Sequence, residues 1–132
     1  EFRRVLFRSP VFFRAELGGM PVYHSNVVLA LGPGWALYFG EGAEKELEGR
    51  EILRLEAEQV QEYAGNVLAV GGRTILSRRA FEALRREQRH RLGDCCVVDI
   101  PTIEQVGGGS ARCMLAEVTT GSRGRSGPHL PF

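Results

Sequence analysis

The chain has 132 residues, 43% of them hydrophobic and 25% charged, which is typical of one globular domain and not of a disordered chain. Its apolar runs stay well short of the roughly 20 residues that a membrane-spanning helix needs, so we expect no membrane partner. The net charge is +1, but five of the 17 basic side chains and one of the 16 acidic ones lie at the two ends. Residues 10–118 therefore carry 12 basic and 15 acidic side chains, and this net of −3 gives no evidence for a nucleic-acid partner.

The two ends differ from the rest of the chain. Residues 1–9, "EFRRVLFRS", begin with Glu1 and resemble the translation of a sequencing adapter, so we exclude them from the fold. Residues 119–132 contain few core-forming side chains, which favours disorder or foreign sequence. We expect residues 10–118 to form one domain that is a fragment of a longer chain.

Three cysteines without regular spacing speak against a secreted disulfide scaffold and favour a reducing, cytoplasmic location.

The first strong element in chain order is residues 22–31, an apolar and β-branched run that stops at Gly32-Pro33-Gly34. It predicts a buried strand in which His24 and Asn26, two positions apart, point to the same face. Residues 35–39 predict the returning strand of a hairpin.

Short elements follow in the middle of the chain. Helices are predicted over residues 41–50 and 56–63, and strands over residues 51–55, 66–70 and 73–76. Gly71-Gly72 lies between the last two strands and favours a two-residue hairpin turn.

The strongest helix signal covers residues 77–92, which Ser77 can cap and Gly93 can end. Its six arginines and two glutamates predict a solvated face. Residues 95–100 predict a buried strand with Cys95 and Cys96 as core side chains, and residues 112–118 predict the last strand. The order strand, strand, helix, strand occurs about twice, which predicts an α/β domain with mixed strand pairing.

Three features could carry chemistry. His24 and Asn26 are polar residues in an apolar run, where each needs a partner, although a strand histidine is often structural. Gly107 to Gly109 precede Cys113 in "GGGSARC", and such a glycine run lets the backbone approach a ligand closely. Cys113 is then either a nucleophile favoured by the neighbouring Arg112 or an inert buried cysteine. Gly65-Asn66 opens a strand after a helix, which is a weaker signal.

The segments "YHSNVVLALGPGWAL", "YAGNVLAV" and "IPTIEQVGGGSARCMLAEV" follow one another in an order that resembles the C-terminal part of the arginine deiminase and amidinotransferase superfamily, the penteins. The resemblance covers residues 21–118 and is closest to the citrulline-utilization hydrolase branch. It implies a partial pentein α/β-propeller, holding about two of five ββαβ units that surround a central active site.

The same resemblance implies the roles of the candidate residues. Cys113 matches the nucleophile, and His24 matches the catalytic histidine, which should lie near Cys113. The residues matching the substrate site are Asn26, where arginine deiminases place an Asp, Asn66, Gly65 and Gly109. The implied reaction is hydrolysis of a C–N bond in a guanidino, amidino or ureido small molecule related to arginine or citrulline, without metal or organic cofactor. The alternatives are an amidinotransferase with the same Cys and His, a non-catalytic binding module and an inactive fragment. We expect the isolated 132 residues to be inactive, because the resemblance places the other half of the site in earlier units.

Overall fold

The computed structural model describes residues 12–116. The predictions for residues 1–9 and 119–132, and for the last two residues of the strand expected over 112–118, lie outside the described residues.

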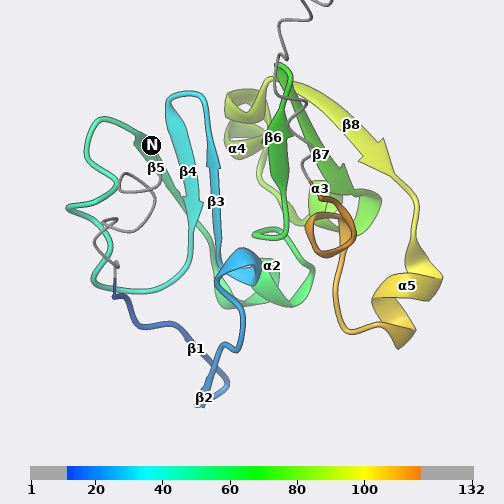
Figure 1. Cartoon of the computed structure of the whole chain (residues 1–132), viewed down its shortest axis with the longest axis horizontal. Helices are drawn as coiled ribbons and strands as arrows, with labels where there is room; N and C mark the ends of the chain where they lie inside the picture. The colour runs from blue at the N-terminus through cyan, green and yellow to red at the C-terminus, as the bar shows by residue number, and fades with distance from the viewer. Residues whose placement is uncertain (1–11, 117–132) are drawn as a thin grey trace, which may run out of the picture.

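Two small mixed sheets make up the framework. The first contains β3 (Leu29–Gly32), β4 (Trp35–Tyr38) and β5 (Glu51–Arg54), and the second contains β6 (Leu68–Val70), β7 (Arg73–Ser77) and β8 (Asp94–Val98). In each sheet the first two strands are antiparallel and the third runs parallel to the second. The sheets lie side by side, with β3 next to β6 (Figure 1). The predicted α/β class with mixed strand pairing is confirmed.

Helical segments join these strands. They are α2 (Ala57–Gln61), α3 (Arg78–Ala83), α4 (Arg86–Leu92), α5 (Pro101–Val106) and the 3-10 turns η1 (Ser25–Val27) and η2 (Ala111–Met114). A two-stranded hairpin, β1 (Glu16–Leu17) and β2 (Met20–Pro21), precedes them. The main core lies between the sheets and helices and is formed by Val28, Trp35, Leu37, Val60, Leu76, Leu84 and their neighbours.

Several local signals are confirmed. Gly71 and Gly72 have φ values of 59° and 78° and close the β6–β7 hairpin, a conformation that glycine adopts without a steric penalty. The Ser77 hydroxyl accepts a hydrogen bond of 3.1 Å from the backbone N–H of Ala80, which caps α3. Gly93, with φ of 73°, follows the end of α4.

The strand predicted over residues 22–31 is wrong in its first half. Only Leu29–Gly32 pairs with β4, whereas Ser25–Val27 forms η1, closed by hydrogen bonds from Val27 N to the His24 carbonyl and from Val28 N to the Ser25 carbonyl. The turn leaves His24 exposed instead of buried in a sheet.

Two predicted helices also change. Residues 44–49 are turns instead of a helix, because Gly42 and Gly49 have φ values of 96° and 84° and Ala43 and Leu47 must reach a separate small core beside Tyr38. The helix predicted over 77–92 is broken between α3 and α4, where Leu84 has extended backbone (ψ 139°) and is buried in the main core. Tertiary packing overrides helix propensity at both places.

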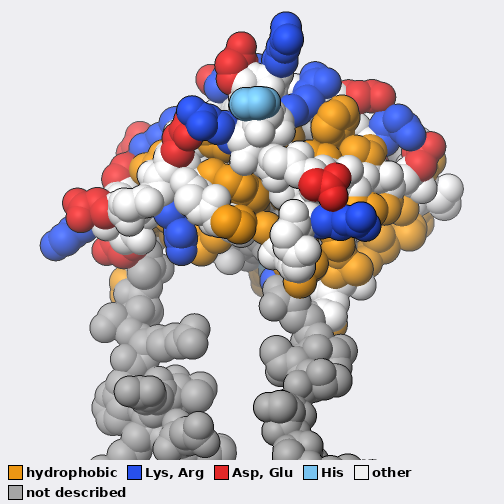
Figure 2. Space-filling view, turned by 90° about the horizontal axis from the view of Figure 1, so that it is seen from above, with side chains coloured by type: hydrophobic (Ala, Val, Ile, Leu, Met, Phe, Trp, Pro, Cys, Tyr) orange, Lys and Arg blue, Asp and Glu red, His pale blue; other side chains and the backbone are white. Residues whose placement is uncertain are grey.

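Four half-exposed arginines of α3, α4 and the short connection between them form ion pairs with acidic residues of other segments. The pairs are Arg78–Asp99 (3.7 Å), Arg79–Glu62, Arg85–Glu56 (3.3 Å) and Arg91–Glu51 (3.0 Å). The predicted solvated face therefore also connects the helices to neighbouring segments. On the face in Figure 2, basic and acidic side chains are interspersed with hydrophobic ones.

The last two strands differ from expectation as well. Residues 111–114 form η2 where a strand was predicted. The strand β8 is confirmed, but it lies at a sheet edge and is only partly buried. Cys95 packs against the main core, whereas Cys96 points to the other face and is exposed, so its prediction as a core side chain is wrong.

Candidate functional site

Cys113 lies on η2, directly after the glycine run, and its side chain is exposed. Two amide groups point at its sulfur: Asn66 Nδ2 donates to Sγ at 3.1 Å, and Asn26 Nδ2 makes a longer contact of 3.7 Å. The thiol is therefore accessible and polar in its surroundings. Asn66 lies 47 positions and Asn26 lies 87 positions before Cys113, so three distant segments of the chain meet at this sulfur.

Asn66 is fully buried and joins these segments. Its Oδ1 accepts hydrogen bonds from the backbone N–H groups of Arg112 (2.9 Å) and Cys113 (3.4 Å). Its Nδ2 donates to the carbonyl oxygen of Asn26 at 3.0 Å as well as to the sulfur. These side-chain contacts satisfy N–H groups that a β-strand would have paired, which is the physical reason that residues 111–114 form a turn.

The chain reaches this position through a tight connection after α2. Tyr63 has a φ of 62°, a left-handed conformation that is uncommon for a non-glycine residue, and Asn66 N donates to the Tyr63 carbonyl at 2.8 Å. Gly65 then passes so close to Val27 that a Cβ on Gly65 would lie 2.1 Å from the Val27 carbonyl oxygen. Only glycine fits there, so Gly65 acts through packing.

The loop before Cys113 is held by a second set of contacts that the sequence did not reveal. The Ser110 hydroxyl donates to Glu104 Oε1 at 2.6 Å, and both residues are buried. The Tyr63 hydroxyl donates to the Glu104 carbonyl oxygen at 3.0 Å. Gly109 lies against the cysteine, since a Cβ on it would be 3.2 Å from Sγ. The burial of Glu104 carries no recognisable sequence signal, because it depends on a contact with Ser110, six positions later.

Asn26 presents an unsatisfied group beside the thiol. Its Oδ1 atom is buried and has no hydrogen-bond partner among the residues that the structure describes. A buried acceptor without a donor costs about 1–3 kcal/mol, so a donor that reached this oxygen would relieve that cost.

His24 lies two residues before Asn26 and is exposed. It precedes η1, and its carbonyl oxygen accepts from Val27 N at 3.1 Å. The imidazole ring contacts the Tyr23 ring edge-on, with 5.2 Å between the ring centres. The imidazole is therefore exposed to solvent. It lies on the same segment as Asn26, whose side chain contacts Cys113 Sγ.

Comparison with protein families gives a match over residues 2–120 to the family described as N,N dimethylarginine dimethylhydrolase, eukaryotic. This range includes the described residues and nearly all of the chain. The chain belongs to this family. Comparisons with curated proteins and with solved structures gave no match.

The dimethylarginine dimethylhydrolase family is a pentein family, so the predicted superfamily is confirmed. Membership also indicates a hydrolase that acts on a guanidino C–N bond of a small molecule. The citrulline-utilization branch and the adapter origin of residues 1–9 stay predictions, and the match itself begins at residue 2.

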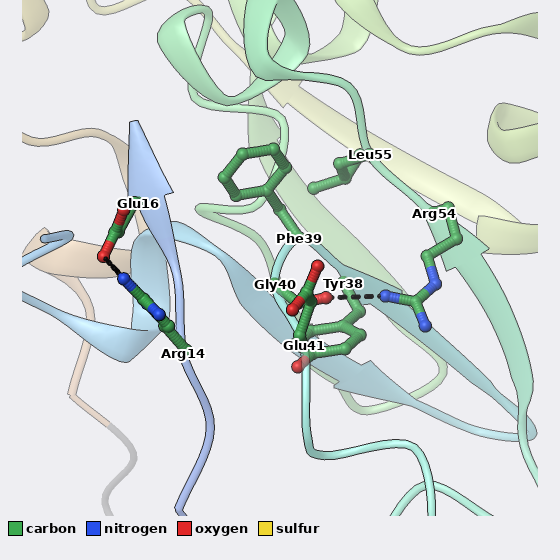
Figure 3. Close-up of a pocket in the computed structure, with 8 residues that line it drawn as sticks. All are labelled: Arg14, Glu16, Tyr38, Phe39, Gly40, Glu41, Arg54 and Leu55. Carbon is green, nitrogen blue, oxygen red and sulfur yellow. Dashed lines mark hydrogen bonds and ion pairs between the residues drawn. The ribbon is translucent and has the colours of Figure 1, made fainter. Parts of the chain in front are cut away.

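A pocket of about 480 Å³ is lined by Arg14, Glu16, Tyr38, Phe39, Gly40, Glu41, Arg54 and Leu55 (Figure 3). Its charged groups are partly engaged, because Arg54 donates to the Gly40 carbonyl oxygen at 2.7 Å and Arg14 pairs with Glu16. None of the candidate residues lines it. Within residues 12–116, no three potential metal ligands cluster and no helix is long and apolar enough to cross a membrane.

Proposed function

We propose that the chain carries the nucleophile and the acid–base group of a hydrolase that cleaves N,N-dimethylarginine at a guanidino C–N bond. The observation that supports this best is the exposed Cys113 thiol, which receives the amide N–H of Asn66 in a chain of the dimethylarginine dimethylhydrolase family. We also propose that the two sheets are two of the five ββαβ units of a pentein α/β-propeller.

The first half-reaction forms a covalent adduct. The Cys113 thiolate attacks the guanidinium carbon, because sulfur is a better nucleophile than water toward this resonance-stabilised centre. The bond from that carbon to the dimethylated nitrogen breaks, and protonated His24 gives its proton to the departing dimethylamine. The substrate remains bound to sulfur as a thiouronium cation.

The second half-reaction releases the product. Neutral His24 takes a proton from a water molecule, whose oxygen adds to the thiouronium carbon. The C–S bond then breaks and returns the thiolate, while the new hydroxyl group loses its proton to solvent, where dimethylamine takes one up. The product is the ureido compound of the citrulline type.

Asn26 and Arg112 have different roles in this proposal. The unpaired Oδ1 of Asn26 is an acceptor for an N–H group of the guanidinium, which supports the expected substrate contact. An amide in place of a carboxylate gives a hydrogen bond without an ion pair, so recognition of the positive charge falls to other groups. Arg112 donates to the Leu115 carbonyl oxygen, a structural contact, and takes no part in the chemistry.

Trapping the adduct tests the proposal directly. A chain that joins these residues to the remaining units of the proposed propeller is mixed with N,N-dimethylarginine, quenched with acid at short times, and digested for peptide mass spectrometry. We expect the mass of the substrate minus dimethylamine on the peptide that contains Cys113. The Cys113→Ser variant should give no adduct, because a hydroxyl at its normal pKa is a far weaker nucleophile.

The Cys96→Ser variant is the matched control, since Cys96 is also exposed but lies on the edge strand β8. It should form the adduct as the wild-type chain does. The proposal is wrong if the adduct appears on Cys95 or Cys96, or if Cys113 carries none.

A further inference from the structure

We propose that Asn66 is a positioning residue that fixes the Cys113 thiol and does not contact substrate. The inference rests on the proposed function only in calling Cys113 the nucleophile. Its evidence is geometric: one buried amide contacts both the backbone and the sulfur of the same cysteine.

The orientation of the Asn66 amide is determined by its backbone partners. The N–H groups of Arg112 and Cys113 require an oxygen, so they face Oδ1, and the carbonyl oxygen of Asn26 requires a donor, so it faces Nδ2. The reversed amide would bring donor against donor and acceptor against acceptor. The group facing Sγ is therefore an N–H donor, and the sulfur is its acceptor.

This arrangement favours negative charge on the sulfur. An N–H donor 3.1 Å from Sγ stabilises a thiolate more than a neutral thiol, because hydrogen bonds to charged groups are stronger. The two contacts to Oδ1 restrict the backbone that carries the cysteine. Asn66 thus stabilises the charge and limits the motion of the attacking atom.

The same contacts leave nothing of Asn66 for a substrate. Both N–H groups of its amide are engaged, its oxygen accepts twice, and the residue has no exposed surface. A ligand would have to break a hydrogen bond within the protein to reach it. The substrate contact that the resemblance implied for Asn66 is better assigned to Asn26, whose oxygen is free of protein donors in the described part of the chain.

The test replaces the amide by a carboxylate in two places. Asn66→Asp keeps the size and the acceptor oxygens but removes the N–H donor and puts a negative charge beside the sulfur. Gln88→Glu makes the same chemical change in another buried amide, which donates to the Arg54 carbonyl oxygen and accepts from Arg85 N. The rate of alkylation by iodoacetamide, a neutral reagent, is measured at each cysteine by peptide mass spectrometry in the full chain.

We expect Asn66→Asp to slow alkylation of Cys113 by about tenfold or more, with Cys96 unchanged, because a like charge disfavours the thiolate. Gln88→Glu should leave the Cys113 rate within about twofold of wild type even though it disturbs a buried network. The inference is overturned if Asn66→Asp leaves the Cys113 rate unchanged or raises it, or if Gln88→Glu slows that rate equally.

If Asn66→Asp fails to fold, a measurement on the wild-type chain tests the inference instead. The side-chain amide of Asn66 is followed by ¹H–¹⁵N NMR before and after Cys113 is alkylated. We expect one of its two N–H resonances to shift strongly, and an unchanged amide would contradict the inference. Neither experiment uses a guanidino substrate, so a missing thiouronium adduct would reject the proposed function and leave this inference standing.

Discussion

Gly65 and Val27 approach each other so closely that no other residue type fits at position 65: a Cβ there would lie 2.1 Å from the Val27 carbonyl oxygen and 3.2 Å from the Cα of Val28. This contact places Asn66 beside the Asn26 carbonyl oxygen. The glycine therefore determines how near the turn after α2 can come to η1, and with it the position of the amide that contacts Cys113.

Replacing Gly65 by alanine should push these two segments apart. Because the clashing atoms belong to backbone, we expect a loss of about 2 kcal/mol or more in the free energy of unfolding. Urea denaturation measures the loss. As a control, Gly71→Asn should cost less than about 1 kcal/mol, since Gly71 has open space around it and Asn tolerates its positive φ. Equal losses for the two variants would contradict the close contact.

The ion pair between Glu62 and Arg79 predicts a loss of stability in acid. The hydrogen bond from Arg79 holds the pKa of the Glu62 carboxyl below its usual 4.5. The folded state then binds fewer protons than the unfolded chain, so this stabilisation is present above about pH 4.5 and lost as the pH falls through the folded-state pKa. The pair is partly exposed, and screening limits it to about 1 kcal/mol.

Urea denaturation between pH 7 and pH 3 checks this dependence. Glu62→Gln should flatten the curve in its acidic part, whereas Glu48→Gln, at an exposed position, should not. A Glu62→Gln curve parallel to that of the wild-type chain would show that the pair contributes nothing.

The neighbouring cysteines Cys95 and Cys96 should differ in reactivity. Burial, and to a smaller degree the nearby Asp94 carboxylate, raises the pKa of the Cys95 thiol, so less of it is thiolate at neutral pH. We expect iodoacetamide to alkylate Cys95 more slowly than Cys96 at pH 8. In urea the two rates should become equal, because unfolding removes the burial. Equal rates in the folded chain would be the contrary result.

Cys95→Ala should lower the free energy of unfolding by about 1 kcal/mol and Cys96→Ala by less, and both variants should still form the adduct on Cys113.

Loss of the His24 imidazole should affect both half-reactions. In His24→Ala we expect adduct formation on Cys113 to slow by about 10²-fold, and hydrolysis of the adduct to slow more, because one group serves as acid and then as base. Rapid acid quenching followed by mass spectrometry measures both rates. His90→Ala, an exposed histidine on α4, is the control and should leave both rates unchanged. Unaltered rates in His24→Ala would remove His24 from the mechanism.

Local signals in the sequence predicted those parts of the fold that depend on neighbouring residues. Gly71-Gly72 predicted a hairpin and Ser77 predicted a cap, because the required backbone conformation or hydrogen bond lies within three residues. Short apolar runs predicted the succession of strands along the chain, but not which strands pair in each sheet. The break between α3 and α4 could not be predicted in this way, since it depends on where Leu84 meets the main core.

The candidate site shows the same division. Cys113, Asn26, Asn66 and Gly65 stood out as residues and lie together, but the two 3-10 turns that carry Asn26 and Cys113 were expected to be strands. Both turns depend on contacts with Asn66, which lies 40 positions after Asn26 and 46 positions before Arg112. Glu104 and Ser110 were missed because their partnership exists only when the loop is closed.

The hydrogen bonds around Cys113 also bear on the order of events during folding. Contacts that span 40 to 87 residues close long loops, and their entropic cost is met only after local hairpins and helices have formed. The environment of the sulfur should therefore be among the last parts of the molecule to mature. The β6–β7 hairpin, by contrast, needs only the two glycines at its tip. During refolding, protection of the Asn66 amide should lag behind protection of that hairpin, so the thiol acquires its partners only when the rest of the chain is in place.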